Sequence, residues 1–261
     1  MNECVLEVKN LKVEFSGQHG WTEVVHGISF SVDRGRISAL VGESGCGKSV
    51  TALSLLRLLG KNGRMSSEQI RMNGKDITDL DQRQRHLICG SQAGIIFQDP
   101  QGSLDPLMRV GDSLCEAAFA HQKKKDKKEI RRQAAGLLLR MGMRDPEQLM
   151  RRYPHELSGG MCQRIMIATA MFLHPPLLIA DEPTTALDVT IQAQILEEMT
   201  RLCRDEQMGI LFITHDLSIV AEIADDIYVM KDGNIVETGR IQEVFRHPRH
   251  SYTKMLLDAA L

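Results

Sequence analysis

The chain has 261 residues, enough for one large domain or for one domain with an inserted lobe. Its 32 lysines and arginines against 34 aspartates and glutamates give a formal net charge of −2, so no overall positive field favours a nucleic-acid partner. A hydrophobic content of 43 % excludes disorder as the main state. Six cysteines without a Cys-x-x-Cys pair argue against a disulfide framework or a metal cluster and predict a soluble chain in a reducing compartment.

The N-terminal part predicts short strands separated by Asn and Gly, which interrupt strands readily. An apolar run then leads into a glycine cluster, and apolar residues at helical spacing follow at 50–59. The strands expected around this helix cover 5–8, 12–15, 28–32, 37–41 and 70–73.

A change of composition after the expected strand 94–97 marks a second unit. Residues 99–111 are rich in Pro, Gly and Asp, and helical patterns follow at 110–120 and 129–141. We therefore expect a helical lobe over about 99–165. We interpret the lysine run between its two helical patterns, at 123–128, as a solvated loop or helix end.

Strands and helices alternate again after the lobe. Strands are expected at 177–180 and 210–214, helices at 191–203 and 218–224, and a hairpin at Asp232-Gly233. Short apolar strands that alternate with helices are typical of a mostly parallel sheet covered on both faces. We expect one α/β domain over 1–261, with a core at about 1–98 and 166–261, an N-terminal antiparallel β part and the inserted helical lobe.

The strongest local signal is GESGCGKS, which lies between an expected strand and an expected helix. Glycines let this backbone wind tightly, so that amides and the helix N-terminus point at phosphate oxygens. Lys48 offers a positive charge to the β- and γ-phosphates, and the Ser49 hydroxyl is a ligand for Mg²⁺. The motif predicts a nucleoside triphosphate site made of Gly42, Glu43, Ser44, Gly45, Cys46, Gly47, Lys48 and Ser49.

Polar side chains follow three other expected strands. Because ligands bind beyond the carboxyl ends of parallel strands, Asp181 and Glu182 should face the phosphates. Asp181 is placed to hold Mg²⁺, and Glu182 can polarise an attacking water. His215 should reach the same edge of the sheet, and Gln98 is a candidate contact to Mg²⁺ or water that would sense movement of the lobe.

A second anion site is predicted where Ser158, Gly159 and Gly160 open the apolar helix 161–172. The phosphate loop already fills the first anion site, and this one belongs to the other lobe. One chain thus has two half-sites, which favours a head-to-tail pair in which each phosphate loop faces the serine–glycine turn of its neighbour.

These motifs, in this order, resemble those of the ATP-binding subunits of ABC transporters, nearly from end to end of the chain. Residues 42–49 resemble the Walker A motif, 157–163 the signature motif and 177–181 the Walker B motif. Gln98 corresponds to the Q-loop residue and Glu182 to the catalytic glutamate. Ala186-Leu187-Asp188 corresponds to the D-loop and His215 to the switch histidine.

The resemblance implies a P-loop NTPase that hydrolyses ATP with Mg²⁺, in which Glu182 and His215 are catalytic and Ser49, Gln98 and Asp181 lie at the metal. It also places Ser158, Gly159, Gly160 and Asp188 at a nucleotide. Two positions depart from the common pattern. Met161 stands where the signature commonly has Gln, and Val50 replaces a Thr after Ser49, which leaves only its backbone N–H for the α-phosphate. The aromatic residue that stacks on adenine in this family would be Phe15 by position, with Trp21 as a rival.

Three segments resemble the oligopeptide, dipeptide and nickel importer group: GESGCGKSVTALSLL at 42–56, FQDPQGSLDPLMRV at 97–110 and HPRHSYTKMLL at 247–257. Many peptide-importing relatives continue further and carry a C-terminal cysteine cluster, whereas this sequence stops at Leu261 and has none. Its length and its Ser-Gly-Gly-Met-x-Gln-Arg form look more like the nickel-importer ATPases. We therefore expect nickel or a metal–chelator complex ahead of peptide.

The resemblance further implies a second, paralogous ATPase chain, two integral membrane permease subunits and an extracytoplasmic solute-binding protein, with no nucleic acid. The chain would sit peripherally on the cytoplasmic face of the cell (inner) membrane. Four alternatives remain open, namely an ATPase subunit of a peptide importer, a soluble non-transport ABC ATPase, a P-loop kinase or GTPase that acts alone, and a regulatory binding module without catalysis, against which the intact Glu182 and His215 argue.

Overall fold

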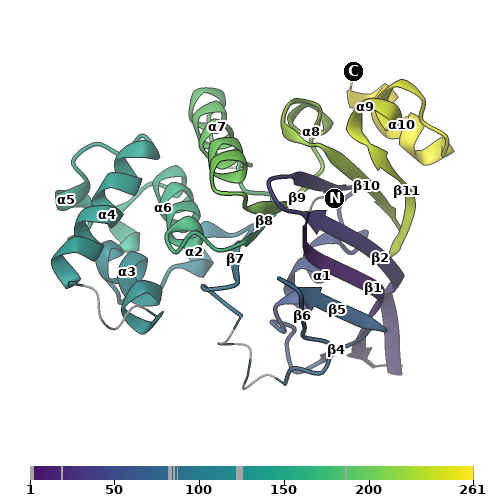
Figure 1. Cartoon of the computed structure of the whole chain (residues 1–261), viewed down its shortest axis with the longest axis horizontal. Coiled ribbons are helices and arrows are strands. Elements are labelled where there is room, and N and C mark those ends of the chain that lie inside the picture. The colour runs from purple at the N-terminus through teal and green to yellow at the C-terminus, as the bar shows by residue number, and fades with distance from the viewer. Residues whose placement is uncertain are drawn as a thin grey trace.

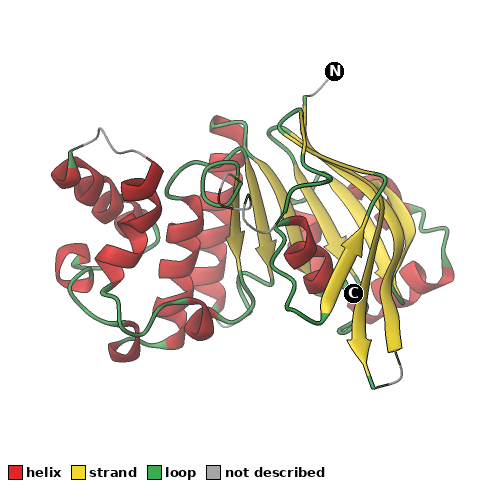
Figure 2. Cartoon of the chain, turned by 90° about the horizontal axis from the view of Figure 1, so that it is seen from below, coloured by secondary structure: helices red, strands yellow, loops and turns green. Residues whose placement is uncertain are grey.

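The structure of the protein is a computed structural model that describes residues 3–18, 20–81, 84, 86, 88–121, 126–185 and 187–260. The molecule is elongated, with one end made of helices alone and the other made of strands with further helices packed on them (Figures 1 and 2). Across these ranges, no helix combines the length and the apolarity needed to cross a bilayer.

An antiparallel sheet forms the N-terminal part, as predicted. Its main hairpin pairs β1 (Cys4–Gly17) with β2 (Gly20–Asp33), each 14 residues long. The shorter strands β4 (Gly63–Ser66), β5 (Gln69–Met72) and β6 (Lys75–Asp76) complete it. The hairpin is longer than the sequence predicted, because register shifts near Asn10, which has a φ of 50°, break the apolar alternation without ending the strands.

Among the described residues, a six-stranded sheet in the order β11-β10-β3-β9-β8-β7 carries the core. Four of its five neighbouring pairs are parallel, and only β11 runs antiparallel, against β10. This confirms the predicted mostly parallel sheet. The strands are β3 (Ile37–Val41), β7 (Ala93–Ile96), β8 (Leu177–Asp181), β9 (Gly209–Thr214), β10 (Asp226–Lys231) and β11 (Asn234–Arg240).

Alternate residues of these strands point to opposite faces of the sheet, and both faces are covered. Leu177 and Ile179 of β8 pack with α1 (Lys48–Leu55) and the N-terminal sheet, whereas Leu178 and Ala180 pack on the other face. The helices of that second face are α6 (Gly159–Met171), α7 (Val189–Asp205), α8 (Leu217–Ile223), α9 (Ile241–Arg246) and α10 (Ser251–Ala260).

The helical lobe lies at the far end of the molecule from the N-terminal sheet (Figure 1). It contains α2 (Pro100–Ser103), α3 (Val110–His121), α4 (Lys127–Arg140), α5 (Pro146–Leu149) and a 3-10 turn, Pro154–Glu156. The boundary predicted at residue 165 falls inside α6, which runs unbroken from the lobe to Met171. Of the predicted lysine run, residues 123–125 lie outside the described residues, and Lys127 and Lys128 are exposed at the start of α4.

An ion-pair network joins the lobe to the core. Glu198 of α7 is 10 % exposed and accepts hydrogen bonds from Arg140 of α4 at 2.9 Å and from Arg201 at 2.8 Å. The hydrogen bond from Arg201 lowers the pKa of the Glu198 carboxyl, against the effect of burial, and Arg140 acts in the same direction. The charged form of Glu198 therefore stabilises the fold.

We expect Glu198→Gln to lower the free energy of unfolding by about 1–2 kcal/mol at pH 7, since both arginines are partly exposed and solvent weakens the pairs. A carboxyl with a lowered pKa in the folded state stabilises above its unfolded pKa, so the difference should disappear as the pH falls below about 4. Denaturant unfolding at several pH values measures it. Glu129→Gln, which removes an exposed pair with Arg132, is the matched control and should change stability by less than about 0.5 kcal/mol. A constant difference from pH 7 to pH 3 would contradict the expectation.

Candidate active site

The functional side chains meet where the parallel strands end. One cavity of about 380 Å³ lies at this edge of the sheet. It is bordered by the loop after β3 and by the residues that follow β7, β8 and β9. The residues that line it are Gly42, Glu43, Ser44, Gln98, Glu182, His215, Leu217 and Leu256. The parallel sheet thus brings together three of the predicted elements, the phosphate loop, the Walker B end and the switch histidine.

The phosphate loop, residues 42–49, winds tightly because two glycines take positions closed to other residues. A Cβ on Gly42 would lie 2.1 Å from the Met230 carbonyl oxygen, and Gly47 has a φ of 109°. The ammonium of Lys48 is buried and donates to the carbonyl oxygens of Gly42 and Glu43, both at 2.8 Å. The cation is therefore held inside the loop, where phosphate oxygens would arrive.

Asp181, at the end of β8, is 5 % exposed, and its Oδ1 has no hydrogen-bond partner within the described residues. Burial raises the pKa of this carboxyl, while a hydrogen bond from the Ser49 hydroxyl acts in the opposite direction. An orphaned carboxylate oxygen beside a hydroxyl fits Mg²⁺, which binds proteins through one or two oxygens and completes its shell with phosphates and water. Within the described part of the chain, no three His, Cys, Asp or Glu side chains are grouped so that they could hold a metal ion.

Glu182 and His215 are in direct contact. Glu182 is strained, with a φ of 48°, and its N–H donates to the Ile213 carbonyl of β9 at 2.9 Å. Its Oε1 lies 2.9 Å from Nδ1 of His215. Since a carboxylate can only accept, Nδ1 carries the proton, and the Nε2 atom of this half-exposed ring remains available to a ligand.

The signature motif does not reach this cavity. Ser158 caps α6 by accepting from the Met161 N–H at 3.3 Å, and neither it nor Gly159 or Gly160 is among the residues that line the cavity. The motif opens α6, whose buried residues pack on the face of the core sheet opposite to the one that α1 covers. Gln163, buried in the same helix, donates a hydrogen bond to the Pro183 carbonyl directly after Glu182.

The D-loop and Gln98 lie at the edges of the site. Asp188 is exposed and caps α7 by accepting from the Ile191 N–H at 3.0 Å, away from the cavity lining. Ala186 lies outside the described residues. Gln98 is exposed and borders the cavity at the start of the lobe.

The two aromatic candidates for adenine lie on opposite faces of the N-terminal sheet. Phe15 is half-buried and packs on the core side, toward α1. Trp21 is exposed, and the Arg64 guanidinium covers its ring at 4.1 Å while donating to Glu14 at 2.8 Å. Because Glu14 and Phe15 are successive strand residues, this contact places Trp21 on the face that Phe15 does not use.

The sequence reasoning missed three residues of the site, and all belong to α8 and α10. Leu217 and Leu256 line the cavity, and the Tyr252 hydroxyl accepts a hydrogen bond from the Glu43 N–H at 2.9 Å. Tyr252 and Leu256 are four residues apart on one face of a helix, so helical spacing could have identified them as buried. The segment 247–257, which contains both residues, indicated only a resemblance to the oligopeptide, dipeptide and nickel importer group.

Sequence comparison identifies the family. The profile of the ABC transporter family matches residues 25–185. The oligopeptide transport ATP-binding protein OppD of Bacillus subtilis is 46 % identical over 254 residues, covering 97 % of this chain and 71 % of the relative. The dipeptide transport ATP-binding protein DppD of Escherichia coli is 46 % identical over 256 residues, covering 98 % and 78 %.

Solved structures agree on the fold. A bacterial ABC transporter cassette, solved as a dimer, superposes with a TM-score of 0.80 at 23 % identity, covering 90 % of this chain and 98 % of the cassette. An ATP-binding subunit of an ABC transporter superposes with a TM-score of 0.76 at 28 % identity, covering 98 % and 99 %. With a family profile across more than half of its length and relatives at 46 % identity over nearly all of it, the chain belongs to the ABC transporter family, as one of its ATPase subunits.

Proposed function

We propose that this chain is the ATP-hydrolysing subunit of an importer for dipeptides or oligopeptides. The observation that carries its ATPase role is the meeting of Lys48, Asp181, Glu182 and His215 at the end of one parallel sheet. Its assignment to peptides rests on the relatives named above. The preference for nickel that the sequence favoured is not confirmed by them.

ATP binds with its phosphates against residues 42–50. The turn from Gly42 through Glu43, Ser44, Gly45 and Cys46 to Gly47 presents its backbone amides, apart from that of Glu43, which donates to Tyr252, and the amides of Ser49 and Val50 extend the row into α1. Lys48 supplies positive charge to the β- and γ-phosphates. Ser49 and Asp181, with Gln98 nearby, would hold Mg²⁺, which when bound neutralises charge on the phosphate oxygens. Adenine stacks on Phe15, because Phe15 lies on the side of the sheet that faces α1.

Glu182 orients and polarises the attacking water, and His215 stabilises the γ-phosphate. The contact between Glu182 Oε1 and His215 Nδ1 supports these roles, because Nδ1–H donates to the carboxylate and leaves Nε2 to face the phosphate. Since a phosphate oxygen only accepts, Nε2 must carry a proton of its own to bind it, while Oε2 of the carboxylate is left to accept from water.

A second nucleotide-binding subunit, a paralogous chain, completes the site in a head-to-tail dimer. The position of Ser158, Gly159 and Gly160 outside this chain's own cavity supports the proposal, since the amides and the serine at the start of α6 are suited to an anion. Asp188 lies at the same interface. The assembly includes two membrane permeases and a solute-binding protein, with this chain on the cytoplasmic face of the membrane.

Uptake measurements decide between peptide and nickel. Cells that carry Glu182→Gln in the chromosomal copy of this chain should lose uptake of labelled di- and tripeptides and keep uptake of radioactive nickel. Loss of nickel uptake with normal peptide uptake would overturn the peptide assignment and favour the nickel alternative. Failure of the wild-type chain to co-purify with integral membrane proteins would instead favour a non-transport ATPase.

A further inference from the structure

The C-terminal helix α10 is fastened to the phosphate loop by one side chain. Tyr252 is 4 % exposed, and its hydroxyl accepts a hydrogen bond from the backbone N–H of Glu43 at 2.9 Å, across 209 positions of sequence. Burial raises the pKa of Tyr252, so the phenol stays neutral at physiological pH. One turn further along α10, Leu256 lines the nucleotide cavity itself.

The peptide unit of the loop that Tyr252 contacts is held on both sides. Lys48 donates to the Gly42 carbonyl at 2.8 Å, while Tyr252 accepts from the Glu43 N–H of the same peptide unit. Further along the loop, the Cys46 carbonyl accepts from the N–H of Gly233 at 3.0 Å. These contacts within the chain fix the course of the loop, so its remaining amides need little reordering to bind phosphate.

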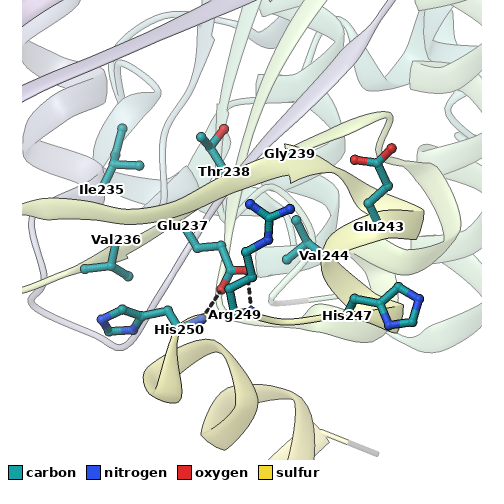
Figure 3. Close-up of a pocket in the computed structure, with 10 residues that line it drawn as sticks. All are labelled: Ile235, Val236, Glu237, Thr238, Gly239, Glu243, Val244, His247, Arg249 and His250. Atoms are coloured by element: carbon teal, nitrogen blue, oxygen red, sulfur yellow. Dashed lines mark hydrogen bonds between the residues drawn. The ribbon is translucent and has the colours of Figure 1, made fainter.

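Tyr252 is itself fixed by the chain that leads into α10. Both carboxylate oxygens of Glu237 accept backbone hydrogen bonds, from Arg249 at 2.7 Å and from His250 at 3.0 Å, at the wall of a second cavity (Figure 3). The His250 Nδ1 then accepts from the Tyr252 N–H at 3.2 Å. The Lys231 ammonium lies 5.1 Å from the centre of the Tyr252 ring.

We propose that Tyr252 is a positioning residue of the ATP site, through which α10 sets the conformation of the phosphate loop and hence its affinity for ATP. The proposal rests on the ATP site proposed above and gives the C-terminal helix a part in it. It requires that loss of the Tyr252 hydroxyl weaken ATP binding more than it slows hydrolysis, since the hydroxyl touches the loop and not the reacting atoms.

The test compares two tyrosine hydroxyls that bond to backbone. Tyr252→Phe keeps the buried ring and removes the contact to Glu43. Tyr228→Phe is the matched control, because the Tyr228 hydroxyl accepts from the Ser31 N–H at 3.1 Å and donates to the Ser31 carbonyl at 3.0 Å, on β2 and away from the loop. Fluorescent ATP titrations, ATPase kinetics and thermal unfolding are measured on the full chain for both variants.

We expect Tyr252→Phe to raise the Kd and the KM for ATP about five- to tenfold, close to 1–1.4 kcal/mol at 1.4 kcal/mol per factor of ten, with kcat changed less than twofold. Both variants should lower the unfolding temperature by about 2–4 °C, and Tyr228→Phe should leave ATP affinity unchanged. If the wild-type chain binds ATP and Tyr252→Phe binds it equally well, the inference fails while the ATPase assignment stands. Equal weakening by both variants also overturns it. A wild-type chain that binds no ATP would overturn both.

Discussion

Glu182→Gln should reduce the rate of ATP hydrolysis by at least about 100-fold and leave ATP affinity within about threefold of wild type. The amide has the size of the carboxylate, and its oxygen can still accept from Nδ1 of His215, so the geometry of the pair is kept. Only the basicity that we propose to polarise the attacking water is lost. Steady-state ATPase kinetics and fluorescent ATP titrations measure the two quantities separately.

A glutamate on the neighbouring helix provides the control. Glu222 is exposed on α8, so Glu222→Gln makes the same chemical change outside the site and should leave both quantities unchanged. Wild-type turnover in Glu182→Gln would contradict the assigned role, and so would a loss of ATP binding as large as the loss of turnover, because it would assign Glu182 to the binding of substrate.

The sequence sufficed to predict the parts of the site that local rules determine. The spacing of GESGCGKS between strand and helix is a local feature, and the structure places β3 before the loop and α1 after it. The rule that ligands bind at the carboxyl ends of parallel strands was enough to bring Glu182 and His215 to one cavity. Neither prediction required knowledge of a contact between distant residues.

What the sequence did not indicate depends on tertiary contacts. The hydrogen bond between Tyr252 and Glu43 joins residues at opposite ends of the chain, and no periodicity relates them. The bond of Glu198 to Arg140 likewise depends on how the lobe sits on the core. The sequence also predicted a break between two strands at Asn10, where the structure has one continuous strand with a bulge. A bulge within a strand gives the same local signal in the sequence as the end of a strand.

Asp181→Asn should have opposite effects on activity and on stability. Hydrolysis should fall by at least about 100-fold, since the variant loses the carboxylate proposed above to hold Mg²⁺. The nucleotide-free chain should nevertheless gain about 1–2 kcal/mol of unfolding free energy, or about 2–6 °C in unfolding temperature. The reason is that the ionised carboxylate is buried at 5 % exposure with Oδ1 unpartnered, and the neutral amide avoids that cost.

Thermal unfolding with and without Mg²⁺ and ATP separates the two effects. The wild-type chain should be stabilised by the ligands more than the variant is, so that the order of their unfolding temperatures reverses when the ligands are added. Glu198→Gln is the informative comparison, because that buried carboxylate is paired with two arginines and its neutralisation should destabilise the chain in either buffer. An Asp181→Asn variant that unfolds below wild type without ligands would mean that the carboxylate is already compensated within the chain. The fit of this site to a divalent cation would then lose its physical basis.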